Sequence, residues 1–575
     1  MSSDPISKLL IDNLSYEPVP LQFGTSGRRG LVVNLTQLEI AINVSAELEY
    51  LTSLPKSAGG ISPGEDFYIG YDLRPSSTQF VAEFAGRGQL FHAIWLTVKE
   101  AGFNPVNLGP LPTPAVMLYA TNRHCASIMV TGSHIPFDRN GYKLNTSIGE
   151  LLKEDEQPIT RQVEDVRKRF YSAPADLSPF NSDGMYKTTS SETVSIDTRA
   201  IELYKQRYVK YFGTSSLSGL RLLVYQHAAV GRDFLVDLLR SLGAEVVAVG
   251  RSEMFVPIDT EAIDAEQITT IQNLVDLTSG SYDAVVSTDG DSDRPLILGI
   301  DNGKVHFFSG DLLGIITAQH IHADAVVVPI SCNDAIDLTN LKSCLFPKTR
   351  IGSPYVISEM RIAVSQGKTR VCGWEANGGF LLGSDLVSES ATLSKLQTRD
   401  AILPIITVLA AAKAASLSVC ELFDELPKRF GRASLIRNFP RATSLKIVEL
   451  LKPTIDPPNY ISFVAPANSK SDSYISPDGM SKLKGLVERF FSITRGFSPA
   501  AWVDYTDGVR IGFTNGDVAH VRPSGNADEM RIYSVANSPE RAETIVAQGV
   551  KEPDGILRQL QAYSESSSST SKKVR

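Results

Sequence analysis

Short apolar strands that alternate with amphipathic helices constrain the fold of this chain more than any other feature. The clearest case is residues 221–250, where "RLLVY" is typical of a strand, "GRDFLVDLLRSLG" of a helix that stops at Gly243, and "AEVVAVG" of a second strand. Parallel strands need a crossover connection of this kind. The segment therefore predicts a β-α-β unit in a sheet that helices cover.

The same alternation occurs in two other parts of the chain. It is present in residues 67–133, from "FYIGYDLRPSS" to "CASIMVTGS", and in residues 282–331, from "YDAVVSTDGDSDRPLILG" to "ADAVVVPIS". A chain of 575 residues is also too long for one hydrophobic core. We therefore expect three related α/β domains with mixed, mostly parallel sheets.

The C-terminal part has a different pattern. Two apolar runs in "GVRIGFTNGDVAHVRPS" flank an Asn-Gly pair, which is a strong hairpin signal, and the helix-like "SPERAETIVAQG" follows. This order predicts a smaller α+β domain. Residues 150–195, rich in charge, Ser, Thr and Pro, are expected to bridge the first two domains. The predicted domains cover residues 1–199, 200–309, 310–435 and 436–563, and the polar residues 564–575 predict a disordered tail.

Composition and charge exclude several classes of protein. A net charge of -8 without a dense Lys/Arg block argues against a nucleic-acid partner. The five cysteines are scattered and form no C-x-x-C pair, so they predict neither a disulfide framework nor a zinc knuckle. The start of the chain lacks the features of a signal peptide. The apolar run 401–420 is interrupted by Pro404 and Lys413 and predicts a buried helix, not a membrane span. We expect a cytoplasmic protein without a membrane partner.

Three carboxylates follow an apolar strand in "VVSTDGDSDRPLILG", at Asp289, Asp291 and Asp293. They repel one another unless a cation lies between them, and oxygen ligands favour Mg²⁺. An EF-hand would need Gly and Glu where the chain has Arg294 and Ile300, so that alternative fails. A solvated acidic turn remains the simpler alternative, and metal binding is the favoured interpretation.

Two polar turns in the second half of the chain suit a phosphorylated sugar. "VRPSGNADEMRIY" combines two arginines with small donors, which can bind phosphate oxygens, although such a turn is often only a hairpin exit. "CGWEANGGFLLG" places Glu375 and Asn377 beside glycines, a pairing that suits sugar hydroxyls, although it is also typical of an exposed glycine-rich turn. In "FGTSGRRGL", Arg28 and Arg29 could lie beside an anion or on a surface turn.

Ser133, in "TGSHIPFDRNGYKL", is not in the G-x-S-x-G context of a hydrolase nucleophile. It can still act by carrying a phosphoryl group, because a cation at the three aspartates would neutralise the phosphoryl oxygens during transfer. Lys143 is then a candidate for moving a proton to or from the accepting hydroxyl. A hydrogen-bonded loop histidine is the favoured interpretation of His134, which we also keep as a catalytic candidate.

Five segments together resemble the α-D-phosphohexomutase superfamily, in their letters and in their order along the chain. They are "FGTSGRRG", "TGSHIPFDRNGYK", "DGDSDR", "GWEANGGF" and "RPSGNADEMRIY", which are similar to the family's arginine, phosphoserine, metal, sugar and phosphate loops. The resemblance spans residues 20–545. It implies three related α/β domains and a smaller α+β domain, arranged as a heart around a central cleft with one active site.

The resemblance also implies a role for each matching residue. Ser133 is the phosphorylated residue, and its phosphate binds Mg²⁺ together with Asp289, Asp291 and Asp293. Lys143 matches the catalytic lysine and Arg29 the arginine of the first loop. The implied substrate-binding residues are Glu375 and Asn377 at the sugar, with Gly373 and Arg294 included, and Arg522, Ser524, Gly525, Asn526 and Arg531 at the phosphate that is not transferred.

The implied reaction is an isomerisation of hexose 1-phosphate and hexose 6-phosphate through a hexose 1,6-bisphosphate, which also acts as activator. We expect mannose phosphates as substrates, by an enzyme that is a monomer or a homodimer. Glucose phosphates are the first alternative, and a non-catalytic protein that binds sugar phosphates is the second. A phosphatase with Asp289 as nucleophile would leave the serine and phosphate loops unexplained.

Two loops depart from the patterns that they resemble. The usual serine loop is T-A-S-H-N-P, and this chain has Gly132 and Ile135 in place of Ala and Asn. In "KTRIGSPYV", similar to a substrate loop of the third domain, Ser353 stands where many members have histidine. Any role of that histidine does not carry over to this chain.

Overall fold

The structure is a computed structural model that describes residues 8–188, 194–261, 263–388, 391–453, 459–464, 476–524 and 528–571. The chain forms two compact units. The first contains Met1–Val326 and Gly352–Phe423, and the second contains Val327–Ile351 and Asp424–Arg575. The first unit includes three helix-covered sheets, and the second a single antiparallel sheet.

The first sheet has the strand order β1-β2-β8-β7-β3-β6, with β9 paired to β8. β3 is parallel to β6 and β7, whereas β8 is antiparallel to β7 and β2. The first part of the predicted alternation is therefore confirmed. The strands are β1 Gln22–Phe23, β2 Arg28–Leu31, β3 Asp66–Tyr71, β6 Asn104–Pro110, β7 Ser127–Val130, β8 Arg139–Thr146 and β9 Gly149–Glu150.

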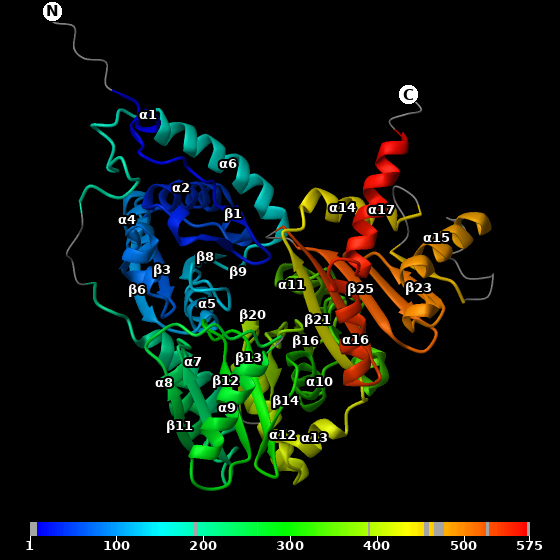
Figure 1. Cartoon of the computed structure of the whole chain (residues 1–575). Helices are drawn as coiled ribbons and strands as arrows, with labels where there is room; N and C mark the ends of the chain where they lie inside the picture. The colour runs from blue at the N-terminus through cyan, green and yellow to red at the C-terminus, as the bar shows by residue number, and fades with distance from the viewer. Residues whose placement is uncertain are drawn as a thin grey trace, which may run out of the picture. The chain divides into compact units, whose positions relative to one another are not determined.

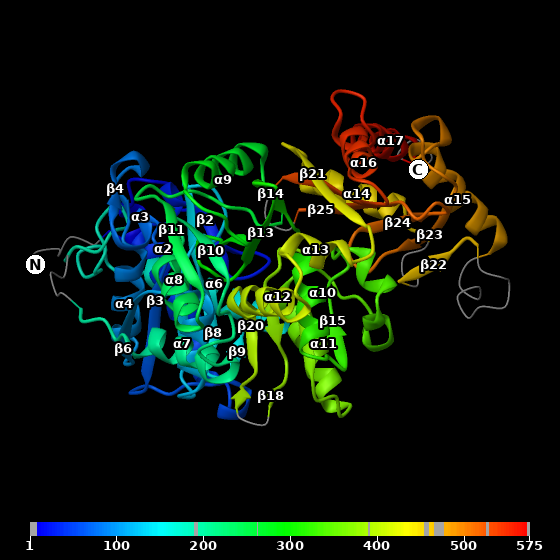
Figure 2. The same cartoon turned by 90° about the horizontal axis from the view of Figure 1, so that it is seen from below.

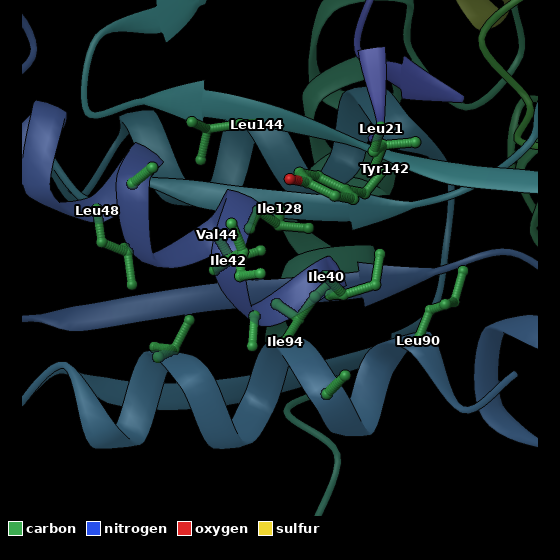
Figure 3. Close-up of a cluster of buried hydrophobic side chains, with 14 of the residues drawn as sticks. Leu21, Ile40, Ile42, Val44, Leu48, Leu90, Ile94, Ile128, Tyr142 and Leu144 are labelled. Carbon is green, nitrogen blue, oxygen red and sulfur yellow. The ribbon is translucent and has the colours of Figure 1, made fainter. Parts of the chain in front are cut away.

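Helices cover both faces of this sheet. α2 (Gln37–Ser53) and α4 (Leu90–Glu100) pack on one face, and α5 (Thr113–Thr121) contacts β3 and β7, with its Tyr119 ring 5.2 Å from that of Tyr68. Apolar side chains of α2, α4, β7 and β8 meet in one buried core (Figure 3). The labelled members from these elements are Ile40, Ile42, Val44, Leu48, Leu90, Ile94, Ile128, Tyr142 and Leu144.

A helix occupies much of the segment that we expected to be a bridge at residues 150–195. α6 (Lys153–Tyr171) lies alongside α2 (Figure 1). Its apolar residues Ile159, Val163 and Val166 are buried, at the spacing of one helix face. The other face of α6 is polar, which accounts for the charge of the segment. Because its apolar face is buried and the helix lies against α2, α6 belongs to the first domain.

The second sheet has the order β11-β10-β12-β13-β14. β10 is parallel to both neighbours, and β12, β13 and β14 pair antiparallel, as expected for a mixed sheet. α8 contacts β10 and β11, while Ile271 of α9 belongs to the same buried core as Leu223 and Tyr225 of β10. The elements are α7 Arg199–Phe212, β10 Arg221–His227, α8 Arg232–Ser241, β11 Glu245–Arg251, α9 Ala265–Leu277, β12 Ala284–Thr288, β13 Pro295–Asp301 and β14 Lys304–Phe307.

The third sheet has the order β15-β16-β17-β20. The apolar run 401–420 contains the buried helix α12, as predicted, and within the described ranges no helix is both long and apolar enough to cross a membrane. The elements are α10 Gly310–His320, β15 Ala325–Val327, α11 Ser353–Ser365, β16 Val371–Trp374, β17 Phe380–Leu382, β20 Leu396–Asp400 and α12 Ile402–Ala415. Short elements of the chain are α1 Leu10–Asn13, α3 Pro75–Thr78, β4 Phe80–Val81, β5 Arg87–Gly88, β18 Leu386–Val387, β19 Thr392–Leu393 and α13 Val419–Asp424.

The second unit contains an antiparallel sheet in the order β21-β26-β25-β24-β23-β22. The predicted hairpin is formed by β24 and β25, and Gly516 in its turn has a φ of 86°. Helices α15, α16 and α17 lie on one side of the sheet (Figure 2) and contribute to its single core. The elements are β21 Phe430–Arg437, α14 Arg441–Leu450, β22 Tyr460–Ser462, α15 Pro477–Phe490, β23 Ala500–Asp504, β24 Val509–Phe513, β25 Val518–Pro523, β26 Glu529–Ala536, α16 Pro539–Val550 and α17 Ile556–Ser571.

The predicted class of three α/β domains and a C-terminal α+β domain is confirmed, with two corrections at its boundaries. The boundary between residues 435 and 436 falls inside β21, because this strand pairs along its whole length with β26. The tail predicted at 564–575 is helical as far as Ser571, because α17 begins on the buried Ile556 and Leu557 and continues through the serines. Residues 572–575 lie outside the described residues, and the other predicted boundaries stay predictions.

His227, at the end of β10, links the stability of the first unit to pH. Its Nε2 donates to the carbonyl oxygen of Thr288 at 2.8 Å, and burial lowers the pKa of the imidazole to about 4. In the unfolded chain this histidine binds a proton at a higher pH, with a pKa of about 6.5. Its neutral form in the fold therefore adds up to ~3 kcal/mol to the free energy of unfolding. This stabilisation is complete above about pH 6.5 and is lost as the pH falls toward 4.

We expect acidification from about pH 7 to about pH 5 to lower the thermal midpoint more in the wild type than in His227→Gln, by a few degrees. Glutamine retains an amide donor but cannot become an imidazolium. Scanning calorimetry at both pH values measures the difference, with His306→Gln, an exposed histidine on β14, as the control. Equal losses in wild type and His227→Gln would contradict the assignment.

Candidate active site

Ser133 lies in the loop between β7 and β8. Its side chain is buried, and its φ of 53° is in the left-handed region, where a residue other than glycine is strained. Its Oγ donates to Oδ2 of Asp289 at 2.8 Å and lies 3.4 Å from Nδ1 of His134. Burial of the His134 ring lowers the pKa of this histidine well below its ordinary value. The loop therefore holds the serine hydroxyl against the carboxylates, beside a neutral imidazole.

Arg74 holds this loop, although it belongs to none of the predicted site motifs. Its side chain is fully buried, and its guanidinium lies 3.9 Å from the centre of the Phe255 ring. A guanidinium has only donors and stays charged, so it needs acceptors when it is buried. The carbonyl oxygens of Ser133, Ile135, Pro136 and Arg139 accept its hydrogen bonds. The available signal was a charged residue directly after the apolar strand in "FYIGYDLRPSS".

Arg74 also contacts the two positions at which the serine loop differs from T-A-S-H-N-P, Gly132 and Ile135. At Gly132 a Cβ would lie 2.5 Å from Nε of Arg74, so glycine leaves the room that this arginine occupies. Ile135 contributes its carbonyl oxygen to Arg74, and a backbone contact of this kind does not depend on the side chain at that position. On the other side, Asp72 accepts from the Thr131 hydroxyl at 2.7 Å and from the Gly132 amide at 3.2 Å.

The three predicted aspartates, Asp289, Asp291 and Asp293, occupy the turn between β12 and β13. All are fully buried, and one oxygen of each lies within 4.8 Å of the others, so that together they could hold a metal ion. A Cβ at Gly290 would lie 2.7 Å from the carbonyl oxygen of Ser133. Glycine at this position thus allows the aspartate turn and the serine loop to approach each other closely.

Two cations lie against these carboxylates. Nζ of Lys143, on β8, is 2.6 Å from Oδ2 of Asp291 and 2.5 Å from Oδ2 of Asp293. The guanidinium of Arg399, on β20, lies 3.0 Å from the same oxygen of Asp293. Lys143 was predicted from its loop, whereas Arg399 was missed because β20 contributes it from a distant part of the chain.

The carboxylates differ in their electrostatic environments. Burial, and then repulsion from Asp291 and Asp293, raises the pKa of Asp289 well above its ordinary value, although Nε of Arg294 lies 3.8 Å from its Oδ2. Burial acts on the other two as well, but Lys143 lowers the pKa of Asp291 and Arg399 that of Asp293. Within the described ranges, Oδ1 of both is buried without a hydrogen-bond partner. A compact cluster of carboxylate oxygens, which includes these two Oδ1 atoms, fits a hard divalent cation such as Mg²⁺.

The two arginines of the first loop have separate environments. Arg28 points into the core, where its Nε lies 2.6 Å from Oε1 of Glu47 and the carboxylate also accepts from Tyr142. Arg29 is half-buried, and one terminal nitrogen donates to the carbonyl oxygens of Arg28 and Tyr142. Arg28 therefore anchors the loop, and Arg29 is the arginine that remains a candidate for the site.

The predicted sugar loop follows β16. Glu375 is buried, and its Oε2 accepts from Arg399 at 2.9 Å, so that one guanidinium bridges this loop and Asp293. Asn377 closes the turn, with its Oδ1 accepting from the amide of Gly379 at 2.9 Å. Gly373 lies within β16 and pairs with Leu381. Glycine at 379 makes room for the arginine, since a Cβ would lie 2.5 Å from Cδ of Arg399.

Ser353, which replaces the histidine of the resembled substrate loop, begins α11. Its hydroxyl donates to Oε2 of Glu150 at 2.7 Å, and Thr398 donates to the other oxygen at 2.6 Å. A pocket beside this contact is lined by Thr113, Lys143 and Glu150 among other residues. The serine is therefore a structural contact between α11 and the first sheet.

The predicted phosphate loop lies in the second unit. Arg522 on β25 and Arg531 on β26 are directly opposite each other in the ladder. Like charges at paired positions repel, and an anion between them would remove that cost. Ser524 is buried, with its amide donating to the carbonyl oxygen of Glu529. Gly525 and Asn526 lie outside the described residues.

The first unit thus brings together residues from three predicted loops, those of the serine, the metal and the sugar. Ser133, His134, Lys143, the three aspartates, Arg294 and Glu375 are connected by the contacts above, with Asn377 in the same turn as Glu375. Such a cluster can hold a serine oxygen beside a cation, with an ammonium group close by for proton transfer. The residues of the phosphate loop lie in the second unit, and the single central cleft stays a prediction.

Three models of the same family match the chain. They are phosphoglucomutase/phosphomannomutase alpha/beta/alpha domain I at residues 20–170, domain II at 202–301 and domain III at 309–430. Each matched range contains most or all of the strands of one of the three sheets of the first unit.

Curated relatives and solved structures agree with this match. A phosphomannomutase of Sinorhizobium fredii is 37% identical over 92% of this chain and 98% of its own length, and one of Salmonella muenchen is 34% identical over 92% and 94%. A phosphoglucomutase/phosphomannomutase family protein of Burkholderia thailandensis has a TM-score of 0.59 at 14% identity, covering 94% of this chain and 97% of its own. An Aspergillus fumigatus N-acetylphosphoglucosamine mutase, solved with GlcNAc-6P and magnesium, has a TM-score of 0.51 at 15% identity, covering 93% and 96%.

Proposed function

Because the chain belongs to the phosphoglucomutase/phosphomannomutase family of the α-D-phosphohexomutase superfamily, and is thus a hexose phosphate mutase, we propose that it interconverts mannose 1-phosphate and mannose 6-phosphate. The two curated relatives named above, both phosphomannomutases, support mannose over glucose. The observation that most supports a phosphoserine mechanism is the Ser133 hydroxyl, held 2.8 Å from Asp289 in a buried carboxylate cluster.

In the proposed reaction, phosphoserine 133 donates its phosphoryl group to a hydroxyl of the hexose phosphate. The bond between the serine oxygen and phosphorus breaks, a bond from the sugar oxygen to phosphorus forms, and the proton of the sugar hydroxyl ends on the serine oxygen, which becomes a hydroxyl again. Lys143 is the candidate for moving that proton, because its Nζ is held beside the serine loop by two carboxylates. The hexose 1,6-bisphosphate then turns over, and its other phosphate returns to Ser133.

Mg²⁺ fits the buried aspartates, and with Asp289, Asp291, Asp293 and a phosphoserine oxygen as ligands it would neutralise charge on the phosphoryl oxygens. Arg294 and Arg399 add positive charge on the protein side of the cluster. Cations already fixed by the fold need no reorganisation when the phosphoryl group moves. The fungal mutase of the same fold was solved with magnesium and a sugar phosphate, which supports magnesium as the cation.

The remaining predicted residues serve to hold the substrate. Glu375 and Asn377 are proposed to contact the sugar hydroxyls, and Arg29 the transferring phosphoryl group. Arg522, Ser524, Gly525, Asn526 and Arg531 are proposed to bind the phosphate that is not transferred. The paired positions of the two arginines support this assignment, because their mutual repulsion favours an anion.

Two alternatives have less support. Phosphatase chemistry at Asp289 would leave the serine and phosphate loops unexplained, and Oδ2 of Asp289 is turned to the Ser133 hydroxyl, from which it accepts. A non-catalytic sugar-phosphate-binding protein would not need Ser133, Lys143 and three aspartates in contact. Glucose phosphates as main substrates remain the nearest alternative.

A coupled assay tests the proposal. Purified protein is given mannose 1-phosphate or glucose 1-phosphate, with Mg²⁺ and a trace of the matching 1,6-bisphosphate, and formation of the 6-phosphate is followed. We expect a higher kcat/KM for mannose. A preference for glucose would overturn the substrate, and no turnover of either would favour a binding protein.

Arg74 should affect catalysis because it positions the serine loop. We expect Arg74→Ala to lower kcat about 100-fold, since a displacement of about 1 Å at a reacting group has an effect of this size. Arg232→Ala is the matched control, because Arg232 is also buried and donates to two carbonyl oxygens, those of His227 and Ser252. Both variants should lower the thermal midpoint. An equal loss of kcat in the two would show that Arg74 acts only through stability.

A further inference from the structure

Asp507 contacts two groups that belong to different predicted loops of the second unit. It lies in the turn between β23 and β24, with its side chain largely buried. Oδ1 accepts from Nε of Arg522 at 3.0 Å, and Oδ2 accepts from the amide of Ile351 at 3.0 Å. Both oxygens of one carboxylate are therefore used, one on the phosphate loop and one on the loop that contains "KTRIGSPYV".

The turn that carries Asp507 is itself held firmly. The carbonyl oxygen of Asp507 accepts from Nε2 of His520 at 2.6 Å, and the carbonyl oxygen of Thr506 accepts from Nε of Arg350 at 3.3 Å. Gly508 has a φ of 75° and no room for a side chain, because a Cβ would lie 2.5 Å from the carbonyl oxygen of Val521. The turn, and with it the carboxylate, is thus placed by backbone contacts with β25 and with Arg350.

We propose that Asp507 is a positioning residue that aims Arg522 at the substrate phosphate and holds the backbone at Ile351 in register with it. A hydrogen bond to Nε fixes the plane of the guanidinium, whose remaining donors are on the terminal nitrogens. Arg522 lies opposite Arg531, and without a fixed carboxylate the two would turn apart. The inference rests on the proposed function, because it assigns the phosphate to Arg522.

The consequence for the substrate follows from this shared contact. The segment Val327–Ile351 is part of the second unit, and Ile330 and Thr349 also pair along its backbone. One carboxylate would therefore fix the positions of both a phosphate bound at Arg522 and a sugar that contacts the backbone near Ile351. Asp507 would influence binding of the hexose phosphate more than the transfer step at Ser133.

Asp507→Asn is the informative substitution. An amide has one acceptor oxygen, so it can serve Arg522 or Ile351, while its NH₂ group faces the other donor. Asp517→Asn is the matched control: Asp517 lies at the other end of the same hairpin, is buried, and pairs with Nε of Arg541 at 2.7 Å. Both variants lose a carboxylate–guanidinium pair, and only the first touches the phosphate loop.

The experiment combines steady-state kinetics with calorimetric titration of inorganic phosphate and mannose 6-phosphate into the full-length variants. We expect Asp507→Asn to raise KM and both dissociation constants about tenfold, with kcat within about threefold of wild type. Asp517→Asn should lower the thermal midpoint and leave KM within about twofold. In an Arg522→Gln background, Asp507→Asn should add little to the loss, because the two residues act together.

Unchanged affinity in Asp507→Asn, or an equal rise of KM in the control, would overturn the inference. The same is true if losses from Asp507→Asn and Arg522→Gln simply add. Failure of the proposed function has a different signature. A wild type that does not turn over hexose phosphates but still loses phosphate affinity in Asp507→Asn would retain the positioning role and refute the reaction.

Discussion

Ser133→Ala is expected to lower kcat by at least about 10⁴-fold, because it removes the oxygen on which the phosphoryl group is proposed to travel. Nothing else in the serine loop can replace it: His134 is held beside the hydroxyl at 3.4 Å, and Arg74 is occupied by loop carbonyl oxygens. The fold should survive, since one buried hydrogen bond, from Oγ to Asp289, is lost. The coupled assay measures kcat, and intact mass measures the phosphorylated fraction.

The two readouts separate the mechanism from general damage. A phosphorylated fraction should be present in the wild type after incubation with hexose 1,6-bisphosphate and absent in Ser133→Ala. Ser127→Ala is the control, because Ser127 is also buried, at the start of β7, and its hydroxyl accepts from Asn145 within the first sheet. Its kcat should stay within about threefold of wild type. Turnover by Ser133→Ala at the wild-type rate would refute the phosphoserine mechanism.

The layout of the sheets followed from the sequence because its signals are local. In residues 221–250 the spacing of apolar residues is sufficient to predict β10, α8 and β11 without information from the rest of the chain. The prediction of a disordered tail was wrong for residues 564–571 because the signal for this helix is not local. Its serines are poor helix formers, but the helix begins on Ile556 and Leu557, whose burial in the core no local pattern of the tail reveals.

The loops of the candidate site were visible as motifs, but the residues that hold them were not. Arg74 contacts its loop through backbone carbonyl oxygens, which leave no trace in the letters of that loop. Arg399 joins Asp293 to Glu375, which are far from each other along the chain. Only the sheet topology brings β20 beside β17 and hence the arginine to both carboxylates.

The second large effect is expected at Lys143. Its Nζ is shared by Asp291 and Asp293, so Lys143→Met leaves two buried carboxylates without this cation. Loss of one partner from a buried ion pair costs about 3–5 kcal/mol, which should lower the thermal midpoint of the metal-free protein by roughly 10 °C. The loss of the group that we propose to move the proton should lower kcat at least about 100-fold.

Magnesium should distinguish this role from a purely structural one. With Lys143 absent, the aspartates attract a divalent cation more strongly, so the rise of the thermal midpoint on adding Mg²⁺ should be larger in Lys143→Met than in the wild type. Lys348→Met is the control, because Lys348 is also held by two carboxylates, Asp334 at 3.0 Å and Asp337 at 2.7 Å, in the second unit. It should lower the midpoint while leaving the Mg²⁺-dependent rise as in the wild type. If Mg²⁺ raises the midpoint of Lys143→Met no more than that of the wild type, Lys143 and the metal do not share these carboxylates.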